Sequence, residues 1–391
     1  MLEPADVETL RLVMRERIGA DMCLLDDIRD ELKDFKRNVK AISPYSSNTI
    51  SIVGTDGGNN NLKFDPFVVH VIRVVDSNNV EYYMDVITPT MPIDQLDNKI
   101  RGRNDALKRM MDFLGVDSIT KLSHVIKYTK PGDPVSPSWI QVYRELVEWA
   151  TLFSLVRDRD YASDTLIVFD GNLRSKVFSG ILFNKLKTGI EEAVREKEAK
   201  NHCKLYVVGV AKHSKVLDRY RLAMHIEKVM KTPYPCYGMV PRSMEEKAYI
   251  WSEYARDDSF DGKGEINKFV AGKMFLVKFG NKPDDPIWPV DILMSQVDEC
   301  DRILGYLLND AIYGFPIPWY PMSLQKAHLN SALVDFDMTI VQDEIMNSIR
   351  SALGDKSERF DHFLLTDDDV SQRRYGRGLR WLPHCLIRMS R

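Results

Sequence analysis

The 391-residue sequence is poor in the features that mark several common classes of protein. Its five cysteines are far apart and form no CxxC pair, which argues against a structural zinc site or a disulfide framework. No run of about 18 apolar residues occurs, so a membrane span is not expected. The N-terminus carries acidic residues early and lacks the apolar core of a signal peptide. These absences predict a cytoplasmic protein.

Strong net charge is also lacking. The formal net charge of −3 excludes a globally basic nucleic-acid binder, although local basic patches are still compatible with it. No Walker A motif is present, so any ATP-driven movement would have to come from a partner. The hydrophobic content of 44% is ordinary for a globular protein, and a chain of this length can bury a large core.

Five strands are predicted from the apolar pattern. Residues 50–55, 67–75 and 80–88 read as an antiparallel meander, with Asn78-Asn79 as a hairpin turn because asparagine tolerates positive φ. The apolar runs "TLIVFD" and "KLYVVGV" are too short for helices and indicate strands buried on both faces. The charged helix expected between them, at about 177–200, implies a parallel crossover.

Helices are predicted around these strands. Apolar residues recur at helical spacing over residues 6–40, in the segment that begins with a capping Ser138, and over 322–333, while 94–114 reads as a polar helix. The element order predicts an α/β fold of the RNase H-like type, a mixed five-stranded sheet with flanking helices. The expected divisions are an N-terminal helical segment (1–45), a core (46–340) and a C-terminal helical and basic tail (341–391).

Two aspartates occupy matching places in this pattern. Asp56 ends the first predicted strand and Asp170 ends the fourth, and each is followed by glycine. If these strands are neighbours, the two carboxylates meet at one edge of the sheet, where they would repel each other. A divalent cation such as Mg²⁺ or Mn²⁺ relieves this repulsion and can activate water for attack on a phosphodiester. The alternative is that both Asp-Gly pairs are simply turns.

Two further ligand positions are expected. The helix between the third and fourth strands offers Glu145 and Glu148 in "RELVEW", and the helical wheel favours Glu145. His328 lies on the predicted helix of residues 322–333 and could bind a metal or carry a proton. Taken singly, each of these residues is more often structural.

At this point the chain resembles the NurA family of nucleases. The resemblance is carried, in order, by "VGTDGGNN", "IVFDGNL", "VVGVAKHSK", "FLVKFG" and "YGFPIPWYPMSLQKAH". It implies an RNase H-like core that degrades DNA by a two-metal mechanism with Mn²⁺ or Mg²⁺. Residues matching the family's catalytic and metal-binding positions are Asp56, Glu148, Asp170 and His328, where the motif favours Glu148 over Glu145. Ala211 before Lys212, and the asparagines after Asp56, depart from the family pattern.

DNA binding requires positive charge near these acids. Arg174 and Lys176 follow Asp170, Lys212 and Lys215 follow the fifth strand, and Lys212 matches the lysine of the family's "GV-K" motif. The C-terminal 21 residues contain six arginines and no acid, and Tyr375 and Trp381 among them could stack on bases. The resemblance also implies a homodimer that works with a HerA-type hexameric translocase, in DNA repair or antiviral defence.

Two other functions remain open. An actin-like or sugar-kinase-like ATPase also places Asp-Gly after a first strand, but it needs a duplicated core and a second phosphate loop, neither of which is visible. A catalytically weak scaffold subunit of a DNA translocase would be favoured if the acids failed to converge.

Overall fold

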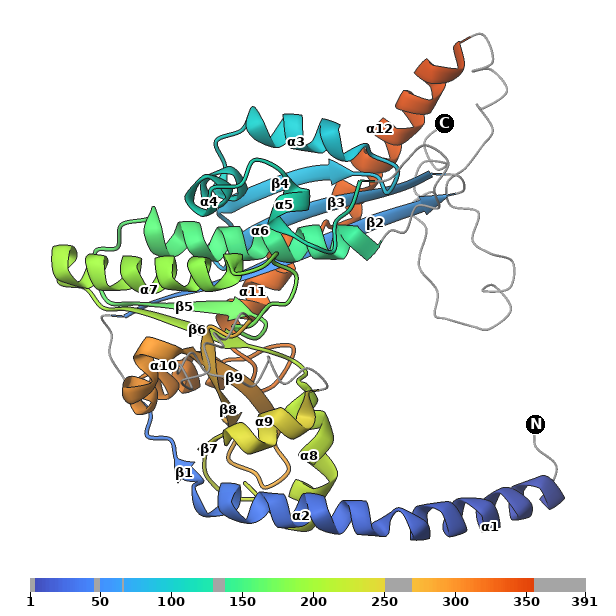
Figure 1. Ribbon diagram of the computed structural model, residues 1–391, viewed down its shortest axis with the longest axis vertical. Coiled ribbons are helices and arrows are strands. Elements are labelled where there is room, and N and C mark those ends of the chain that lie inside the picture. Colours follow the sequence, from blue (N-terminus) through green and yellow to red (C-terminus); the bar gives the residue numbers. More distant parts are fainter. Residues whose placement is uncertain (1–3, 46–49, 65–66, 129–137, 250–268, 355–391) are drawn as a thin grey trace, which may run out of the picture. The chain divides into compact units, whose positions relative to one another are not determined.

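The computed structural model describes residues 4–45, 50–64, 67–128, 138–249 and 269–354 (Figure 1). The chain divides into two compact units. The larger unit holds Met1–Asn61 and Val69–Ala332, and the smaller holds Leu62–Val68 and Leu333–Arg391. All the acids, the histidine and the basic residues proposed for the site, apart from those of the C-terminal tail, belong to the larger unit.

The described residues form one mixed sheet of nine strands, in the order β1-β7-β8-β9-β6-β5-β2-β3-β4. β2 pairs with β5 and β5 with β6 in parallel, whereas β3–β4, β6–β9, β8–β9, β7–β8 and β1–β7 are antiparallel. The strands are β1 (Lys40–Ala41), β2 (Ser51–Phe64), β3 (Phe67–Asp76), β4 (Glu81–Ile87), β5 (Thr165–Asp170), β6 (Leu205–Val210), β7 (Cys236–Met239), β8 (Gly272–Lys278) and β9 (Ile287–Leu293).

The five strands predicted from the sequence are neighbours in this sheet, as β4-β3-β2-β5-β6. The parallel pairing of β5 with β6 confirms the predicted crossover, and Asn79 has the positive φ (61°) expected of the β3–β4 turn. The predicted sheet of five strands is too small, because β9, β8, β7 and β1 continue it beyond β6. The prediction that the first strand ends at Asp56 is also wrong, since β2 runs to Phe64.

Helices cover both faces of the sheet. They are α1 (Pro4–Ala20), α2 (Met22–Arg37), α3 (Ile93–Arg101), α4 (Ala106–Leu114), α5 (Ile119–Leu122), α6 (Ser138–Arg157), α7 (Leu182–Asn201), α8 (Lys215–Ile226), α9 (Arg242–Ala248), α10 (Cys300–Ile312), α11 (Met322–Ser331) and α12 (Asp335–Leu353), with a 3₁₀ turn at Met294–Glu299. The predicted helices at 6–40 and 94–114 are each two helices, the predicted helix at 177–200 begins only at Leu182, and Ser138 is the first helical residue of α6.

The side chains of β5 alternate between two hydrophobic clusters, as expected for a strand buried on both faces. Ile167 and Phe169 pack with side chains of α6 and α7, which lie side by side in Figure 1. Leu166 and Val168 pack with side chains of α10 and α11. β5 and its neighbours are therefore fixed from both sides, and the residues that follow their strands are held in position.

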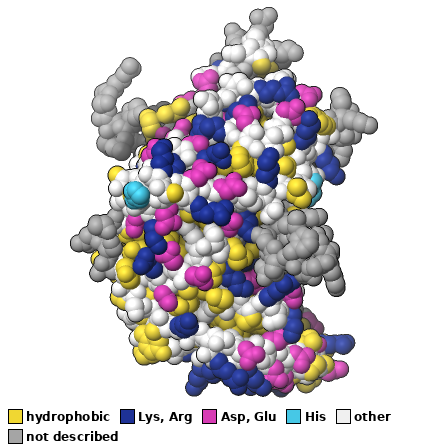
Figure 2. Space-filling view, turned by 60° about the vertical axis from the view of Figure 1, so that its left-hand side comes forward, with side chains coloured by type: hydrophobic (Ala, Val, Ile, Leu, Met, Phe, Trp, Pro, Cys, Tyr) yellow, Lys and Arg dark blue, Asp and Glu magenta, His cyan; other side chains and the backbone are white. Residues whose placement is uncertain are grey.

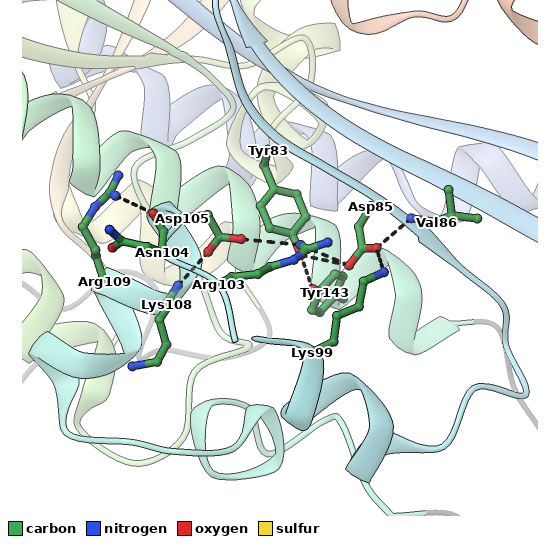
Figure 3. A network of polar contacts seen from close by, with 10 residues as sticks. All are labelled: Tyr83, Asp85, Val86, Lys99, Arg103, Asn104, Asp105, Lys108, Arg109 and Tyr143. Atoms are coloured by element: carbon green, nitrogen blue, oxygen red, sulfur yellow. Dashed lines mark hydrogen bonds and ion pairs between the residues drawn. The ribbon is translucent and has the colours of Figure 1, made fainter. Parts of the chain in front are cut away.

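A buried polar network ties the edge strand β4 to α6 (Figure 3). Asp85, 3% exposed, lies 3.3 Å from the guanidinium of Arg103 and accepts a hydrogen bond from Tyr83. The Tyr83 hydroxyl also contacts that of Tyr143 on α6, and Arg103 stacks over the Tyr83 ring at 5.1 Å. Because each polar group has a partner, this network fixes α6 against the sheet without leaving a buried charge unpaired.

The N-terminal helices differ in their packing. Leu32 and Phe35 of α2 are buried against side chains of α8, whereas Leu12, Met14 and Ile18 of α1 are exposed. In the part of the chain that the structure describes, no helix is both long enough and apolar enough to cross a membrane.

Two sequence expectations concern residues whose structure is not described. The segment just before Ser138, residues 129–137, and the basic C-terminal tail, with Tyr375 and Trp381, lie outside the described residues. The expected boundary between residues 340 and 341 falls inside α12.

Candidate active site

Strand pairing brings Asp56 and Asp170 to the same level of the sheet. The parallel register of β2 and β5 aligns Thr55 with Phe169, and the two aspartates are the next residues of their strands. Asp56 directly follows Thr55, the last residue of β2 that pairs with β5. The two carboxylates are 11% and 12% exposed. Their closeness follows from the parallel pairing of β2 with β5, which meets the condition on which the sequence prediction depended, that the two strands be neighbours.

A cavity of about 410 Å³ opens beside these two aspartates. It also contains Glu148, Lys212 and His328, so the residues predicted for metal binding and the lysine predicted for phosphate lie together. Its full lining is Asp56, Gly57, Gly58, Asn60, Arg144, Glu148, Asp170, Lys212, His328, Ser331 and Ala332.

The structure distinguishes between the two glutamates of α6. Glu148 lines the cavity with Asp56 and Asp170, and its carboxylate is 13% exposed. Glu145 is absent from that lining; it lines a neighbouring cavity of about 800 Å³, which Glu148 and Asp170 also line, and it accepts a hydrogen bond from Ser175. The helical wheel favoured the wrong glutamate for this cavity, because α6 is buried around most of its circumference and has no single inward stripe.

The two glycines after Asp56 allow other parts of the site to approach the backbone of β2. A Cβ atom at Gly57 would overlap Oε1 of Glu148 and lie 2.8 Å from its Cγ. A Cβ atom at Gly58 would overlap the carbonyl oxygen of Ser331, at the end of α11. The missing side chains therefore make room for the third carboxylate and for the helix that carries His328.

Asp56 pairs with the histidine of α11. His328 Nδ1 lies 2.6 Å from Asp56 Oδ2, and the Ser331 hydroxyl donates to the same oxygen over 3.4 Å. Burial raises the pKa of Asp56, but the hydrogen bond and charge of His328 outweigh it and lower the pKa below its ordinary value. The same hydrogen bond raises the pKa of His328.

Asp170 is held by two donors from different elements. Lys212 Nζ donates to Oδ2 and the Tyr320 hydroxyl donates to Oδ1, each over 2.9 Å. Burial and the charge of Asp56 nevertheless raise the pKa of Asp170. Tyr320 was not predicted as a site residue, although it lies inside the quoted "YGFPIPWYPMSLQKAH" motif.

Glu148 carries the largest electrostatic cost of the three carboxylates. Burial raises its pKa to about 8, and the charges of Asp56, Glu145 and Asp170 add to the rise. Arg144, one helical turn earlier and also missed by sequence analysis, opposes it with Nε 3.2 Å from Glu148 Oε1. Three crowded carboxylates of which one resists ionisation are the arrangement that a divalent cation relieves.

The side chains of the candidate site are of the chemical types that bind a hard cation. Among the described residues, no group of three His, Cys, Asp or Glu side chains is arranged to hold an ion as it stands. Asp56, Glu148 and Asp170 each contact a basic side chain instead, namely His328, Arg144 and Lys212. Carboxylate oxygens with an imidazole nearby suit Mn²⁺ or Mg²⁺, and an ion would compete with these basic side chains for the carboxylates.

One of the predicted DNA-binding residues is buried. The Arg174 side chain is 2% exposed and forms a two-point hydrogen bond to Asp291 (2.9 Å each), with Glu245 3.2 Å away. These two carboxylates engage its guanidinium and disfavour the predicted contact with DNA, although Arg174 also lines the cavity of about 800 Å³.

The other predicted basic residues lie along cavities. Lys176 and Lys215 line the cavity of about 800 Å³, and Lys212 lines the candidate site. On the face seen in Figure 2, Lys and Arg side chains are interspersed with Asp and Glu. The lining of the candidate site itself includes the basic side chains of Arg144, Lys212 and His328.

Comparisons with known proteins return structural likenesses alone. No family model and no curated protein matches the chain. The NurA nuclease from Sulfolobus solfataricus has a TM-score of 0.41 at 13% identity, over 89% of this chain and 98% of that one. A structure of NurA bound to dAMP and manganese has a TM-score of 0.36 at 9% identity, over 85% and 94% of the two chains. A structure of NurA with manganese has a TM-score of 0.33 at 12% identity, over 86% and 97%.

Proposed function

We propose that this chain is a divalent-metal-dependent deoxyribonuclease that hydrolyses phosphodiester bonds. The observation that carries the proposal is the convergence of Asp56, Glu148 and Asp170, from β2, α6 and β5, on one cavity that also contains Lys212 and His328. Burial and neighbouring negative charges raise the pKa of Glu148 and Asp170. Carboxyl groups with such shifted pKa values, next to a lysine that can reach a phosphate, suit phosphoryl-transfer chemistry.

In this proposal Asp56, Glu148 and Asp170 would hold two Mn²⁺ or Mg²⁺ ions, with His328 beside them. When bound, such ions supply an activated water and stabilise the charge on the departing oxygen. Tyr320 fixes the orientation of Asp170 through its hydroxyl, and Lys212 shifts from Asp170 to a phosphate of the strand. His328, 2.6 Å from Asp56, is placed to give a proton to the departing oxygen.

We also propose an RNase H-like core and a place in the NurA family. The order β4-β3-β2-β5-β6, with β2, β5 and β6 parallel, supports the core assignment. Work as a homodimer with a HerA-type hexameric translocase, in DNA end processing or defence, is part of this proposal. The exposed apolar side chains of α1 support a partner contact there.

The alternatives have less support. An actin-like ATPase needs a duplicated core, whereas the described residues form one sheet. A catalytically weak scaffold was expected if the acids failed to converge, and they converge on one cavity.

Cleavage of end-labelled single- and double-stranded DNA tests the proposal. Wild type should cleave with Mn²⁺ or Mg²⁺ and not with EDTA. Asp56→Asn and Asp170→Asn keep the side-chain volume and should lower the rate at least about a hundredfold. Asp112→Asn, on the exposed face of α4, is the matched control and should cleave like wild type. Metal-independent cleavage, or full activity in both site variants, would overturn the proposal.

A further inference from the structure

A second cavity of about 590 Å³ lies beside α8. Lys212 lines both this cavity and the candidate active site. The second cavity has an apolar wall that includes Leu217, Met224 and Ile317. Its basic side chains come mostly from α8 and the segments next to it, and they are Lys212, His213, Arg221, His225 and Lys231. Two acids, Asp284 and Asp285, also line it, and Asp284 pairs with Lys231.

The wall that contains Ile317 belongs to a tightly held loop between α10 and α11. The buried side chain of Gln325 accepts a hydrogen bond from the Ile317 N–H (2.8 Å) and donates to the carbonyl oxygens of Ile317 (3.1 Å) and Tyr320 (2.9 Å). A Cβ atom at Gly314 would overlap the Tyr320 carbonyl oxygen, so the two arms of the loop touch. The loop is therefore a firm support rather than a loose connection.

This loop presents two large aromatic rings to solvent. Tyr313 and Phe315 are 75% and 74% exposed, and Ile317, two residues further along, is 38% exposed and faces the second cavity. At its other end the loop reaches the candidate site, where Tyr320 donates to Asp170. Exposed aromatic rings on a firm support beside a basic cavity are the combination that binds unpaired bases, because every base has a face that can stack.

We propose that the second cavity and the rings of Tyr313 and Phe315 form a strand-binding subsite for single-stranded nucleic acid. The inference rests on the proposed function and concerns the nucleotides next to the phosphate that is cleaved. A nucleotide next to the candidate site enters the second cavity, with its phosphate toward Lys212 and Arg221 and its base against the apolar wall. The following bases stack on Tyr313 and Phe315. Double-stranded nucleic acid cannot use this subsite until its bases are unpaired.

Binding measured in EDTA separates this subsite from cleavage. The probe is a fluorescein-labelled oligothymidylate of about 20 nucleotides, followed by anisotropy with the full chain, next to an abasic strand of equal length. Phe315→Ala and Tyr313→Ala should each weaken oligothymidylate binding roughly five- to hundredfold, with little change for the abasic strand. Tyr128→Ala, also at an exposed tyrosine (55%) but lining neither cavity, should bind like wild type.

The basic side chains of the second cavity are tested separately, by the salt dependence of binding. Arg221→Gln should lower the dependence of log affinity on log salt by about 0.7, the contribution of one phosphate contact on a single strand. Phe315→Ala should leave that slope unchanged. The inference is overturned if wild type does not bind the strand, if Phe315→Ala and Tyr313→Ala bind it like wild type, or if they lose affinity equally for the abasic strand. If wild type binds as expected but does not cleave with metal, the proposed nuclease function fails and the subsite stands.

Discussion

At the scale of the residue, Gly57 has the most specific requirement. Glu148 lies against its backbone, in the space that any side chain at residue 57 would occupy. At Gly58 the neighbour is instead the backbone carbonyl of Ser331, which cannot rotate away as a side chain can. The two adjacent glycines therefore serve different purposes, one at the carboxylate cluster and one at the packing of α11.

We expect Gly57→Ala to displace Glu148 and lower cleavage by up to about a hundredfold, because small misplacements of reacting groups are costly. The thermal midpoint should change little, because the side chain of Glu148 can rotate away. Gly58→Ala should instead lower the midpoint clearly. Gly102→Ala is the control, since its nearest neighbours are 3.7 and 3.9 Å from a Cβ atom and its φ of −79° suits any residue. Equal activity of Gly57→Ala and wild type would contradict the close approach of Glu148.

The two glutamates of α6 allow a direct comparison. Glu148→Gln removes a carboxyl group from the cavity of Asp56 and Asp170, whereas Glu145→Gln removes one that is bonded to Ser175 outside it. We expect the first variant to lose at least about a hundredfold in metal-dependent cleavage and the second to retain most of it. Rate measurements at saturating Mn²⁺ decide between them, and the reverse result would restore the helical-wheel interpretation.

At the scale of the element, a buried ion cluster joins three segments of the larger unit. Arg174 follows β5, Asp291 lies in β9 and Glu245 in α9, and all three side chains are at most 4% exposed. Burial raises the pKa of Glu245, and the Arg174 charge opposes the rise. The cluster fixes the segment that follows Asp170.

Removal of Arg174 should therefore destabilise the fold. Arg174→Met leaves two buried carboxylates without their partner, which costs about 3–5 kcal/mol in buried ion pairs of this kind. Urea unfolding should show a lower midpoint, whereas Lys121→Met, which breaks an exposed pair on α5, should leave the midpoint unchanged. An Arg174→Met variant that is as stable as wild type but binds DNA poorly would contradict this structural role and favour the predicted DNA-binding one.

The contact between α2 and α8 depends on a carboxylate. Burial raises the pKa of Glu31, but hydrogen bonds from Tyr220 and Lys247 and the charges of Lys247 and Arg219 outweigh burial and lower it below its usual 4.5. A lowered pKa stabilises the folded state above the unfolded value, and this stabilisation is lost as pH falls through the folded value.

Thermal midpoints at neutral and acid pH check this sign. The thermal midpoint of wild type should exceed that of Glu31→Gln by most at neutral pH. The difference should disappear in acid, below the pKa values of Glu31 in both the folded and the unfolded state. A difference that is constant with pH would show that packing alone, and not the charge of Glu31, holds α2 against α8.

At the scale of the whole molecule, the sequence predicts the local pattern better than the distant contacts. The continuous apolar runs of β5 and β6 identify central parallel strands, and Asp170 at the end of β5 meets Asp56 because β2 pairs with β5 in parallel. The partners of Arg174 lie 71 and 117 residues away, so no local pattern could indicate that it is buried. The extension of β2 beyond Asp56 was missed because the glycines and asparagines that follow it usually end a strand.

The central claim is that three carboxylates from β2, α6 and β5 form one divalent-metal site, and Mn²⁺ binding tests it most directly. Electron paramagnetic resonance of free Mn²⁺, titrated with the full chain near neutral pH, reports binding without any nuclease assay. The account predicts that wild type and Asp112→Asn bind alike, and that Asp56→Asn, Glu148→Gln and Asp170→Asn each weaken binding at least about tenfold. Equal binding by all five proteins, or no binding by wild type, would contradict it.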